Sequence, residues 1–240
     1  MATLFISDLH LDADRPDIGA QFLAFLETEA RAAAALYILG DLFESWVGDD
    51  DPNPHYAAMK TAIRTLADAG VPVFFMHGNR DFMIGRQFAE ETGVQLLDDP
   101  TPLELYGERV LLSHGDALCT DDLQYQQVRQ MTRDPKWQAM MLAKPLDERL
   151  AFAEQARAAS RAHYASASED IMDVNADAVA HSFREHEMDI LLHGHTHRPA
   201  VHVIELPDRR VTRIVLGDWY KQGSVVIWDE QGPRLQVLPR

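Results

Sequence analysis

Short apolar runs alternate with helical patterns over the first part of the chain. Each run is followed by a turn that contains polar residues or glycine, so the runs predict buried strands. The three upstream runs are Leu4–Ile6, Leu36–Leu39 and Val73–Met76. Between them, apolar residues recur at helical spacing after Pro16 and after Pro54. This alternation predicts a layered α/β sheet.

The pattern changes after the run Val110–Leu112. Residues 121–184 have an almost wholly helical pattern, which Asp134-Pro135 and Lys144-Pro145 interrupt. Strand patterns then return in four stretches. These are Asp189–Leu192, Val201–Leu206, Val211–Leu216 and Ser224–Trp228, with the last strand region ending near Leu238. We therefore expect a main domain of residues 1–122 and 172–240, with a helical insertion at residues 123–171.

Side chains that can bind a metal follow five of the predicted buried strands. They are four imidazoles, two carboxylates and one amide: Asp8, His10, Asp41, Asn79, His114, His195 and His197. The carboxyl ends of strands in an open α/β sheet are where such folds bind ligands. Nitrogen and oxygen ligands without thiolate suit Mn, Fe, Zn or Co better than Mg. Seven ligands exceed the need of one ion and suit two ions about 3.5–4 Å apart that share a carboxylate.

Each fragment alone also has an ordinary structural explanation. Asp8 and His10 could cap a strand end, and Asp41 could be a turn residue. Asn79 could adopt a left-handed turn, His114 could be a hydrogen-bonded core histidine, and the last two histidines could lie in a surface turn. Their shared position at strand ends favours one site. We expect His77 and His193 to pack around it, and the acidic run at residues 49–51 to be a solvated loop that could alternatively face the site.

Charge and composition restrict the class of partner. The 240 residues carry a net charge of −16, which argues against a protein that binds along a nucleic-acid backbone. Residues 123–167 carry seven basic and four acidic side chains, so this segment has a charge of +3 and the remainder −19. A single cysteine, Cys119, excludes an internal disulfide and fits a cytoplasmic protein. Without an apolar run of about 20 residues or a basic leader, we expect a soluble or membrane-surface protein.

Several longer motifs resemble those of the calcineurin-like metallophosphoesterases. The ordered motifs are Asp-x-His at residues 8–10, Gly-Asp at 40–41, Gly-Asn-Arg-Asp at 78–81, His114 within a His-Gly-Asp motif, and Gly-His-Thr-His at 194–197. The neighbouring motifs at residues 114–122, 193–200 and 215–219 resemble the branch of that family that cleaves the diphosphate of UDP-2,3-diacylglucosamine in lipid A biosynthesis. The resemblance implies a four-layer sandwich of two sheets flanked by helices, a helical cap and two Mn²⁺ ions.

The division of these ligands between two ions, and the substrate contacts, are implied by this resemblance. It implies a first ion bound by Asp8, His10, Asp41 and His197, and a second bound by Asp41, Asn79, His114 and His195. Asn79, Arg80 and Asp41 would be catalytic. The substrate would contact Asn79, Arg80, Asp122, Tyr125, Ser160 and His195. A glycolipid nucleotide substrate implies contact with the cytoplasmic face of the inner membrane, with no nucleic-acid partner and no obligatory protein partner.

Arg80 stands where many metallophosphoesterases have a histidine. An arginine stays cationic and binds phosphate oxygens, so it suits a phosphate leaving group that needs little protonation. Alternatively, Arg80 could simply pair with Asp81. A further departure is the stretch Tyr164–Ser168, which has no basic residue where relatives commonly have a lysine.

The insertion carries more apolar side chains than short helices hide among themselves. They are Met131, Trp137, Met140, Met141, Leu142, Leu146, Leu150 and Phe152. They could enclose acyl chains or could pack onto the sheet domain. Two other functions stay open: a soluble phosphoesterase acting on nucleotides or phosphoproteins, and a metal-stabilised scaffold that binds proteins.

Overall fold

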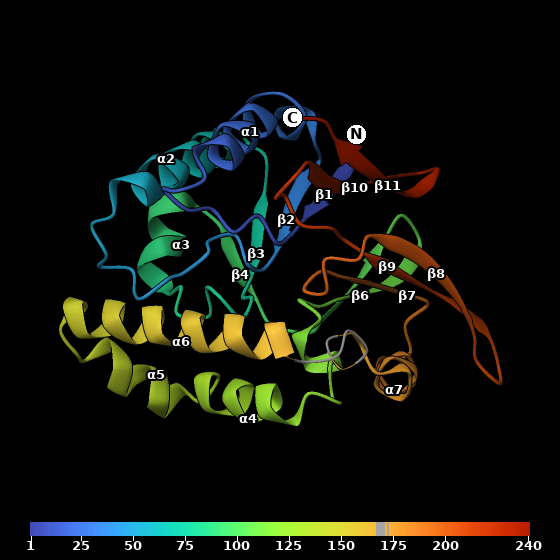
Figure 1. Cartoon of the computed structure of the whole chain (residues 1–240). Coiled ribbons are helices and arrows are strands. Elements are labelled where there is room, and N and C mark those ends of the chain that lie inside the picture. The colour runs from blue at the N-terminus through green and yellow to red at the C-terminus, as the bar shows by residue number, and fades with distance from the viewer. Residues whose placement is uncertain (167–170, 172) are drawn as a thin grey trace.

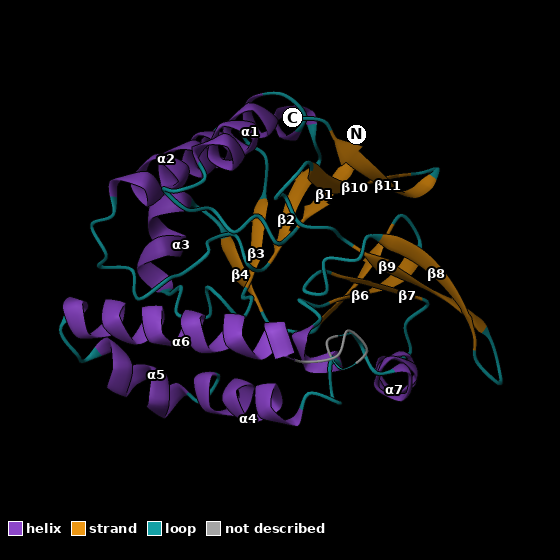
Figure 2. Cartoon of the chain, in the orientation of Figure 1, coloured by secondary structure: helices purple, strands orange, loops and turns teal. Residues whose placement is uncertain are grey.

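Two mixed sheets form the centre of the molecule (Figures 1 and 2). The computed structural model describes residues 1–166, 171 and 173–240, and it describes side chains for these residues except 163–166. The first sheet has the order β11 (Gly232–Leu238), β10 (Gly223–Asp229), β1 (Thr3–Ile6), β2 (Ala35–Leu39), β3 (Val73–Met76) and β4 (Gln95–Leu97). The second has the order β5 (Thr101–Leu105), β6 (Glu108–Leu112), β7 (Ile190–His193), β9 (Arg210–Val215) and β8 (Ala200–Glu205).

The strands that precede the predicted ligands are parallel within each sheet. β1, β2 and β3 pair in parallel, with Leu4 opposite Leu36 and Leu36 opposite Val73. β6, β7 and β9 also pair in parallel in the second sheet. Their carboxyl ends therefore lie at one edge of each sheet, as the sequence pattern requires.

Helices cover the outer face of each sheet, which gives four layers. The helices α1 (Pro16–Glu27), α2 (Pro54–Asp68) and α3 (Arg86–Thr92) lie against the first sheet, and α7 (Ala176–His186) lies against the second (Figure 2). Leu4 and Ile6 pack under the first group of helices, whereas Phe5 packs between the sheets. Both faces of β1 are therefore buried, which explains why its sequence is a continuous apolar run. The predicted fold class is confirmed.

Three further helices occupy the predicted insertion. They are α4 (Leu123–Thr132), α5 (Pro135–Leu142) and α6 (Leu146–Ser166). The Asp134 side chain caps α5 by accepting a hydrogen bond from the Lys136 N–H at 2.7 Å, with Pro135 in the first turn. In Figure 1 the three helices lie together on one side of the molecule, apart from α7. The boundaries of the insertion stay a prediction.

The apolar residues of these helices divide between the core of the sheet domain and the surface. Met141 is buried in the core cluster of the first sheet, and Trp137 packs against it. Met140, Leu142 and Leu150 are exposed. Within the described residues, no helix is both long and apolar enough to cross a membrane.

The acidic run at residues 49–51 is a loop, as expected, and its Asp50 side chain is 62% exposed, but Asp49 and Asp50 also make specific contacts. Asp49 accepts hydrogen bonds from the Gly85 N–H at 3.0 Å and the Phe88 N–H at 3.0 Å, so it caps α3. Asp50 accepts hydrogen bonds from both terminal nitrogens of Arg149, a buried residue of α6. This run therefore links the sheet domain to the helical insertion.

Candidate metal centre and adjoining pocket

The predicted ligands leave their strands on strained turns. Asp8, His10, Asp41, His195 and His197 all have a positive φ, between 51° and 67°. Non-glycine residues rarely adopt this conformation, and such strain gathers at functional sites. The conformation lets each side chain fold back toward the space between the two sheets.

Two glycines permit the close approach of these turns. A Cβ atom on Gly78 would lie 2.1 Å from Asp41 Oδ1, and one on Gly194 would lie 2.2 Å from Asp8 Oδ2. Neither position can hold a side chain without displacing a predicted ligand.

Asp8, His10 and His197 form the first group of ligand atoms. His10 Nε2 lies 3.2 Å from His197 Nε2, and His197 Nε2 lies 3.4 Å from Asp8 Oδ1. Asp41 Oδ2 lies 3.8 Å from His10 Nε2. The ligand atoms of Asp8, His10 and His197 lie close enough together to bind one ion.

Asn79, His114 and His195 form the second group. Asn79 Oδ1 lies 2.9 Å from both His114 Nε2 and His195 Nδ1. The other oxygen of Asp41, Oδ1, lies 3.8 Å from His114 Nε2. Asp41 thus presents one carboxylate oxygen to each group, as a bridging ligand would.

Outer partners set the protonation of the rings. His10 Nδ1 lies 3.0 Å from Glu44 Oε2, and His197 Nδ1 lies 3.5 Å from Asp218 Oδ2. With a proton on each Nδ1, both Nε2 atoms carry lone pairs. Two such lone pairs 3.2 Å apart need a proton or a metal cation between them, and in the metal-free protein, against the effect of burial, Asp8 raises the pKa of His197. The residues of the first group therefore fit a metal ion.

The sequence prediction missed Glu44 and Asp218. A signal existed for Asp218, because Gly217-Asp218 directly follows the buried end of β9 and repeats the motif at Gly40-Asp41. For Glu44 no such pattern is present. Its role follows only from the turn that brings it beside His10.

The protonation of the second group reflects a strongly anionic site. Burial alone would lower the pKa of His114, but the charges of Asp41, Asp116 and Asp8 raise it to about 9. Burial and the charge of His114 lower the pKa of His195 to about 4. Of these two imidazoles, only His114 is therefore positively charged at neutral pH. A divalent cation would displace the extra proton of His114, and its donor set would then be ionised carboxylates and neutral imidazole nitrogens.

Arg80 lies at the edge of both ligand groups. Its backbone N–H donates to Asp41 Oδ1 at 2.8 Å, and its carbonyl accepts from the Trp46 N–H at 3.2 Å. The Asp81 carboxylate instead accepts hydrogen bonds from the backbone N–H groups of Asp41, Leu42, Phe43 and Gly78. Asp81 thus serves to fix the ligand-bearing turns. This favours a substrate role for Arg80 over a simple pair with Asp81.

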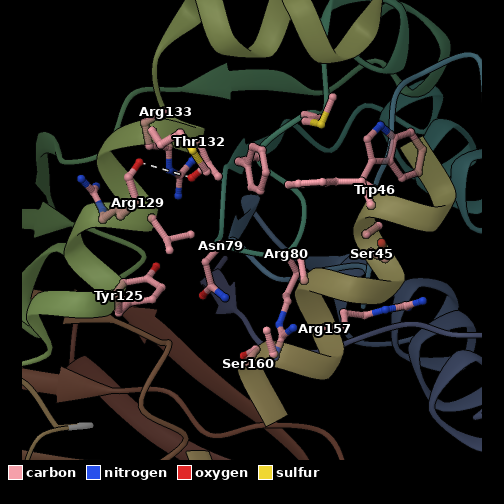
Figure 3. A pocket seen from close by; sticks show the side chains of 18 of the residues that line it. Ser45, Trp46, Asn79, Arg80, Tyr125, Arg129, Thr132, Arg133, Arg157 and Ser160 are labelled. Carbon is pink, nitrogen blue, oxygen red and sulfur yellow. Dashed lines mark hydrogen bonds between the residues drawn. The ribbon is translucent and has the colours of Figure 1, made fainter. Parts of the chain in front are cut away.

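A pocket of about 440 Å³ adjoins the second ligand group. All six residues expected to contact a substrate line it: Asn79, Arg80, Asp122, Tyr125, Ser160 and His195. Figure 3 shows Arg80 extending toward Ser160, with Tyr125 and Trp46 on opposite sides of the pocket. The departure at Tyr164–Ser168 lies outside the described side chains.

The far part of this pocket is apolar and lies between the insertion and the sheet domain. Trp46, Val47, Phe82 and Met83 line one side, and Val128, Met131, Met141 and Phe152 line the other. His10, Asp41 and His197 line a second pocket of about 330 Å³. The two pockets share Asn79, Arg80, Ser160 and His195. An apolar cavity and the candidate metal centre therefore meet at Arg80.

His77 and His193 lie beside the ligands, as expected. His77 Nε2 lies 2.7 Å from the carbonyl of Ile84, and His193 Nδ1 lies 2.8 Å from that of Gly194. Burial lowers the pKa of His193 to about 3, so its ring is neutral.

Comparison with known proteins agrees with the motifs. The model of the calcineurin-like phosphoesterase family matches residues 1–199. A UDP-2,3-diacylglucosamine hydrolase of Stenotrophomonas maltophilia (strain K279a) is 51% identical, and the match covers 100% of each chain. The enzyme of that name in Xanthomonas oryzae pv. oryzae (strain PXO99A) is 54% identical, with 98% of each chain covered. An archaeal phosphodiesterase structure aligns with 99% of this chain and 100% of its own, at 14% identity and a TM-score of 0.49. The chain belongs to the calcineurin-like phosphoesterase family, as its motifs predicted.

Proposed function

We propose that this protein hydrolyses the diphosphate of UDP-2,3-diacylglucosamine to UMP and 2,3-diacylglucosamine 1-phosphate. One observation carries the proposal: an apolar pocket opens onto the ligand groups at Arg80. Such a pocket suits a substrate with acyl chains at one end and a diphosphate at the other. The full-length relatives named for this substrate support the same assignment.

The cofactor that we propose is a pair of Mn²⁺ ions. Asp8, His10, Asp41 and His197 would hold the first ion, and Asp41, Asn79, His114 and His195 the second. When bound, two such cations supply an activated water molecule and stabilise charge that develops on the phosphate. Family membership implies a divalent metal, and the mixed nitrogen and oxygen donors favour a transition metal.

The chain's own residues orient the diphosphate. The Arg80 guanidinium binds non-bridging phosphate oxygens, and Asn79 and His195 face the same space from the second ligand group. Hydrolysis would add a water oxygen to the phosphorus on the uridine side and break the bond from that phosphorus to the bridging oxygen, and the proton that water loses would pass to solvent. The sugar phosphate leaves as a stable anion, so Arg80 needs to supply charge and no proton.

The acyl chains would lie in the apolar part of the pocket. Trp46 and Phe82 of the sheet domain face Met131 and Phe152 of the insertion across this space. In this arrangement the predicted insertion acts as a cap. Enclosed methylenes leave water, which stabilises the complex by about 0.8 kcal/mol each.

Substrates of graded acyl length test the proposal. With Mn²⁺ and monodisperse detergent, removing four enclosed methylenes should lower kcat/KM by about 100-fold, as UMP release would show. UDP-glucosamine without acyl chains is the control substrate. A flat profile, with equal activity on simple phosphodiesters, would favour a soluble phosphoesterase instead. Metal binding without any hydrolysis would favour the scaffold.

We also propose that the protein works at the cytoplasmic face of the inner membrane. The insertion is the part of the chain with net positive charge, and it exposes Leu123, Met140, Leu142 and Leu150. Exposed apolar and basic side chains together favour contact with an anionic lipid surface. This contact would bring the pocket near its lipid substrate.

A further inference from the structure

Two side chains of α4 and that of Arg133, the residue that ends this helix, converge on a single buried carboxylate. Tyr125, Arg129 and Arg133 follow one another at spacings of four residues, so they share a helix face. The Tyr125 hydroxyl donates to Asp116 Oδ2 at 2.7 Å, and Arg129 Nε donates to it at 3.0 Å. A terminal nitrogen of Arg133 lies 3.5 Å from the same oxygen. Asp116 is fully buried two residues after His114, so this helix face is fixed to the loop that bears His114.

Arg133 also reaches the turn that carries Asn79. Its terminal nitrogen donates to the Gly78 carbonyl at 3.0 Å and to the His77 carbonyl at 3.4 Å. The Gly78 N–H is held from another side by Asp81 Oδ1 at 2.8 Å. Both polar groups of Gly78 are therefore fixed, and the peptide that leads into Asn79 has a defined orientation.

The third contact of this helix face is with His195. The Tyr125 ring lies with its centroid 5.7 Å from that of His195. The helix face therefore contacts the His195 ring, the loop of His114 and the turn of Asn79. His195, His114 and Asn79 belong only to the second ligand group, whereas Asp41 belongs to both groups.

We propose that Arg133, held in place by Asp116, is a positioning residue for the second cation. This inference rests on the proposed pair of cations. Arg133 coordinates nothing itself. Arg133 fixes the Gly78 carbonyl and so orients the peptide between Gly78 and Asn79. This orientation places Asn79 Oδ1 beside the rings of His114 and His195. The helix α4 is accordingly part of the framework of the metal centre, although it lies in the segment expected to be a cap.

Two substitutions with similar chemistry separate this role from general stability. Arg133→Met keeps the aliphatic stem and removes the ion pair with Asp116 and the donor to the Gly78 carbonyl. Arg149→Met makes the same change on α6, where Arg149 donates to the Val47 carbonyl at 2.6 Å and to the Asp50 carboxylate. Both remove a cation that ties a helix of the insertion to the sheet domain. Its partners Lys144, Val47 and Asp50 are not predicted ligands.

Calorimetric titration of the metal-stripped full chain with Mn²⁺, without substrate, measures the effect. The wild-type protein should bind two ions. Arg133→Met should weaken the second ion by about 10- to 100-fold, the usual loss when a group that orients metal ligands is removed. Arg149→Met should leave both affinities within about twofold of wild type. Mn²⁺ electron paramagnetic resonance should show a coupled pair in wild type and isolated ions in Arg133→Met at two equivalents.

Each alternative result has a distinct meaning. Unchanged affinities in Arg133→Met, or equal losses in both variants, would overturn the positioning role while leaving the pair of cations intact. A single ion in the wild-type protein would overturn the pair itself, and this inference with it. If Arg133→Met does not fold, Arg133→Lys retains the charge without the guanidinium fork and should give a smaller loss at the second ion only.

Discussion

Five of the seven predicted ligands occupy a backbone conformation that their residue types rarely adopt. The positive φ angles of Asp8, Asp41 and His197 mean that the surrounding packing holds these turns against their own preference. That packing includes the Asp81 carboxylate, which accepts hydrogen bonds from several neighbouring N–H groups. The geometry of the site is therefore formed before any cation binds, and single substitutions should affect separate functions.

Arg80 should act on the substrate and leave the metals unaffected. Its guanidinium cannot coordinate a cation, whereas its backbone N–H already orients Asp41. We expect Arg80→Ala to lower kcat by about 100- to 1000-fold, the typical loss of one preorganised donor to a reacting oxygen. Metal analysis should still find two ions per chain. Retained turnover would restrict Arg80 to a structural role.

Proton release should accompany metal binding at the second ligand group. The pKa of His114 is raised from 6.5 to about 9 in the protein without metal, mainly by Asp41 once the opposing effect of burial is overcome. The protonated form therefore stabilises the metal-free protein fully below pH 6.5, and this contribution is lost as pH rises through 9. A cation must displace this proton, so its affinity should rise with pH up to about 9. Calorimetry at pH 7 in buffers of different ionisation enthalpy would detect the release, and buffer-independent heats would contradict it.

At the scale of elements, the strands that carry ligands were predictable and the edge strands β4 and β5 were not. β1, β2 and β7 are apolar on both faces, because helices or the second sheet cover them, and this leaves a clear pattern. The strands β4 and β5 are partly exposed and have weak patterns, so the sequence did not predict them.

The candidate site was predictable to the extent that its residues lie next to these buried strands. Each ligand was recognisable because it directly follows a strand. The contacts of Glu44, Asp116 and Arg133 depend on how distant turns pack, which no local spacing encodes. Of these three, Glu44 and Asp116 lie in motifs with a recognised ligand, at residues 40–44 and 114–122, but neither motif reveals the partners of its carboxylate.

The helix α6 should depend on Arg149 for its position over the pocket. Arg149 is buried and joins Lys144, Val47 and Asp50 through hydrogen bonds from one guanidinium. Removing these donors in Arg149→Met should lower the free energy of unfolding by about 1–3 kcal/mol. Because α6 contributes Phe152 to the apolar lining, the KM for the acylated substrate should rise more than kcat falls. Urea unfolding and steady-state kinetics would test this. An unchanged KM would mean that the position of α6 does not depend on the hydrogen bonds of Arg149.

At the scale of the whole molecule, charge is divided unevenly between the two parts of the chain. Residues 123–167 carry +3 within a protein of net charge −16. An anionic membrane would repel the sheet domain and attract the helices α4–α6, so it would favour one orientation. The same helices expose the apolar side chains of Leu123 and Met140.

Binding to lipid vesicles should therefore require anionic lipid and weaken with salt. Lys136 is exposed on α5 and Lys144 lies just after that helix, and each basic residue near an anionic surface contributes about 1 kcal/mol. Reversing both, in Lys136→Glu with Lys144→Glu, should abolish co-sedimentation with phosphatidylglycerol vesicles. Arg31→Glu is a control for altered charge, because Arg31 is exposed in the short helix Ala30–Ala32, outside the predicted insertion. It should bind as wild type does. Equal binding to phosphatidylcholine vesicles, or equal losses in the control, would mean that the insertion does not direct the protein to the membrane.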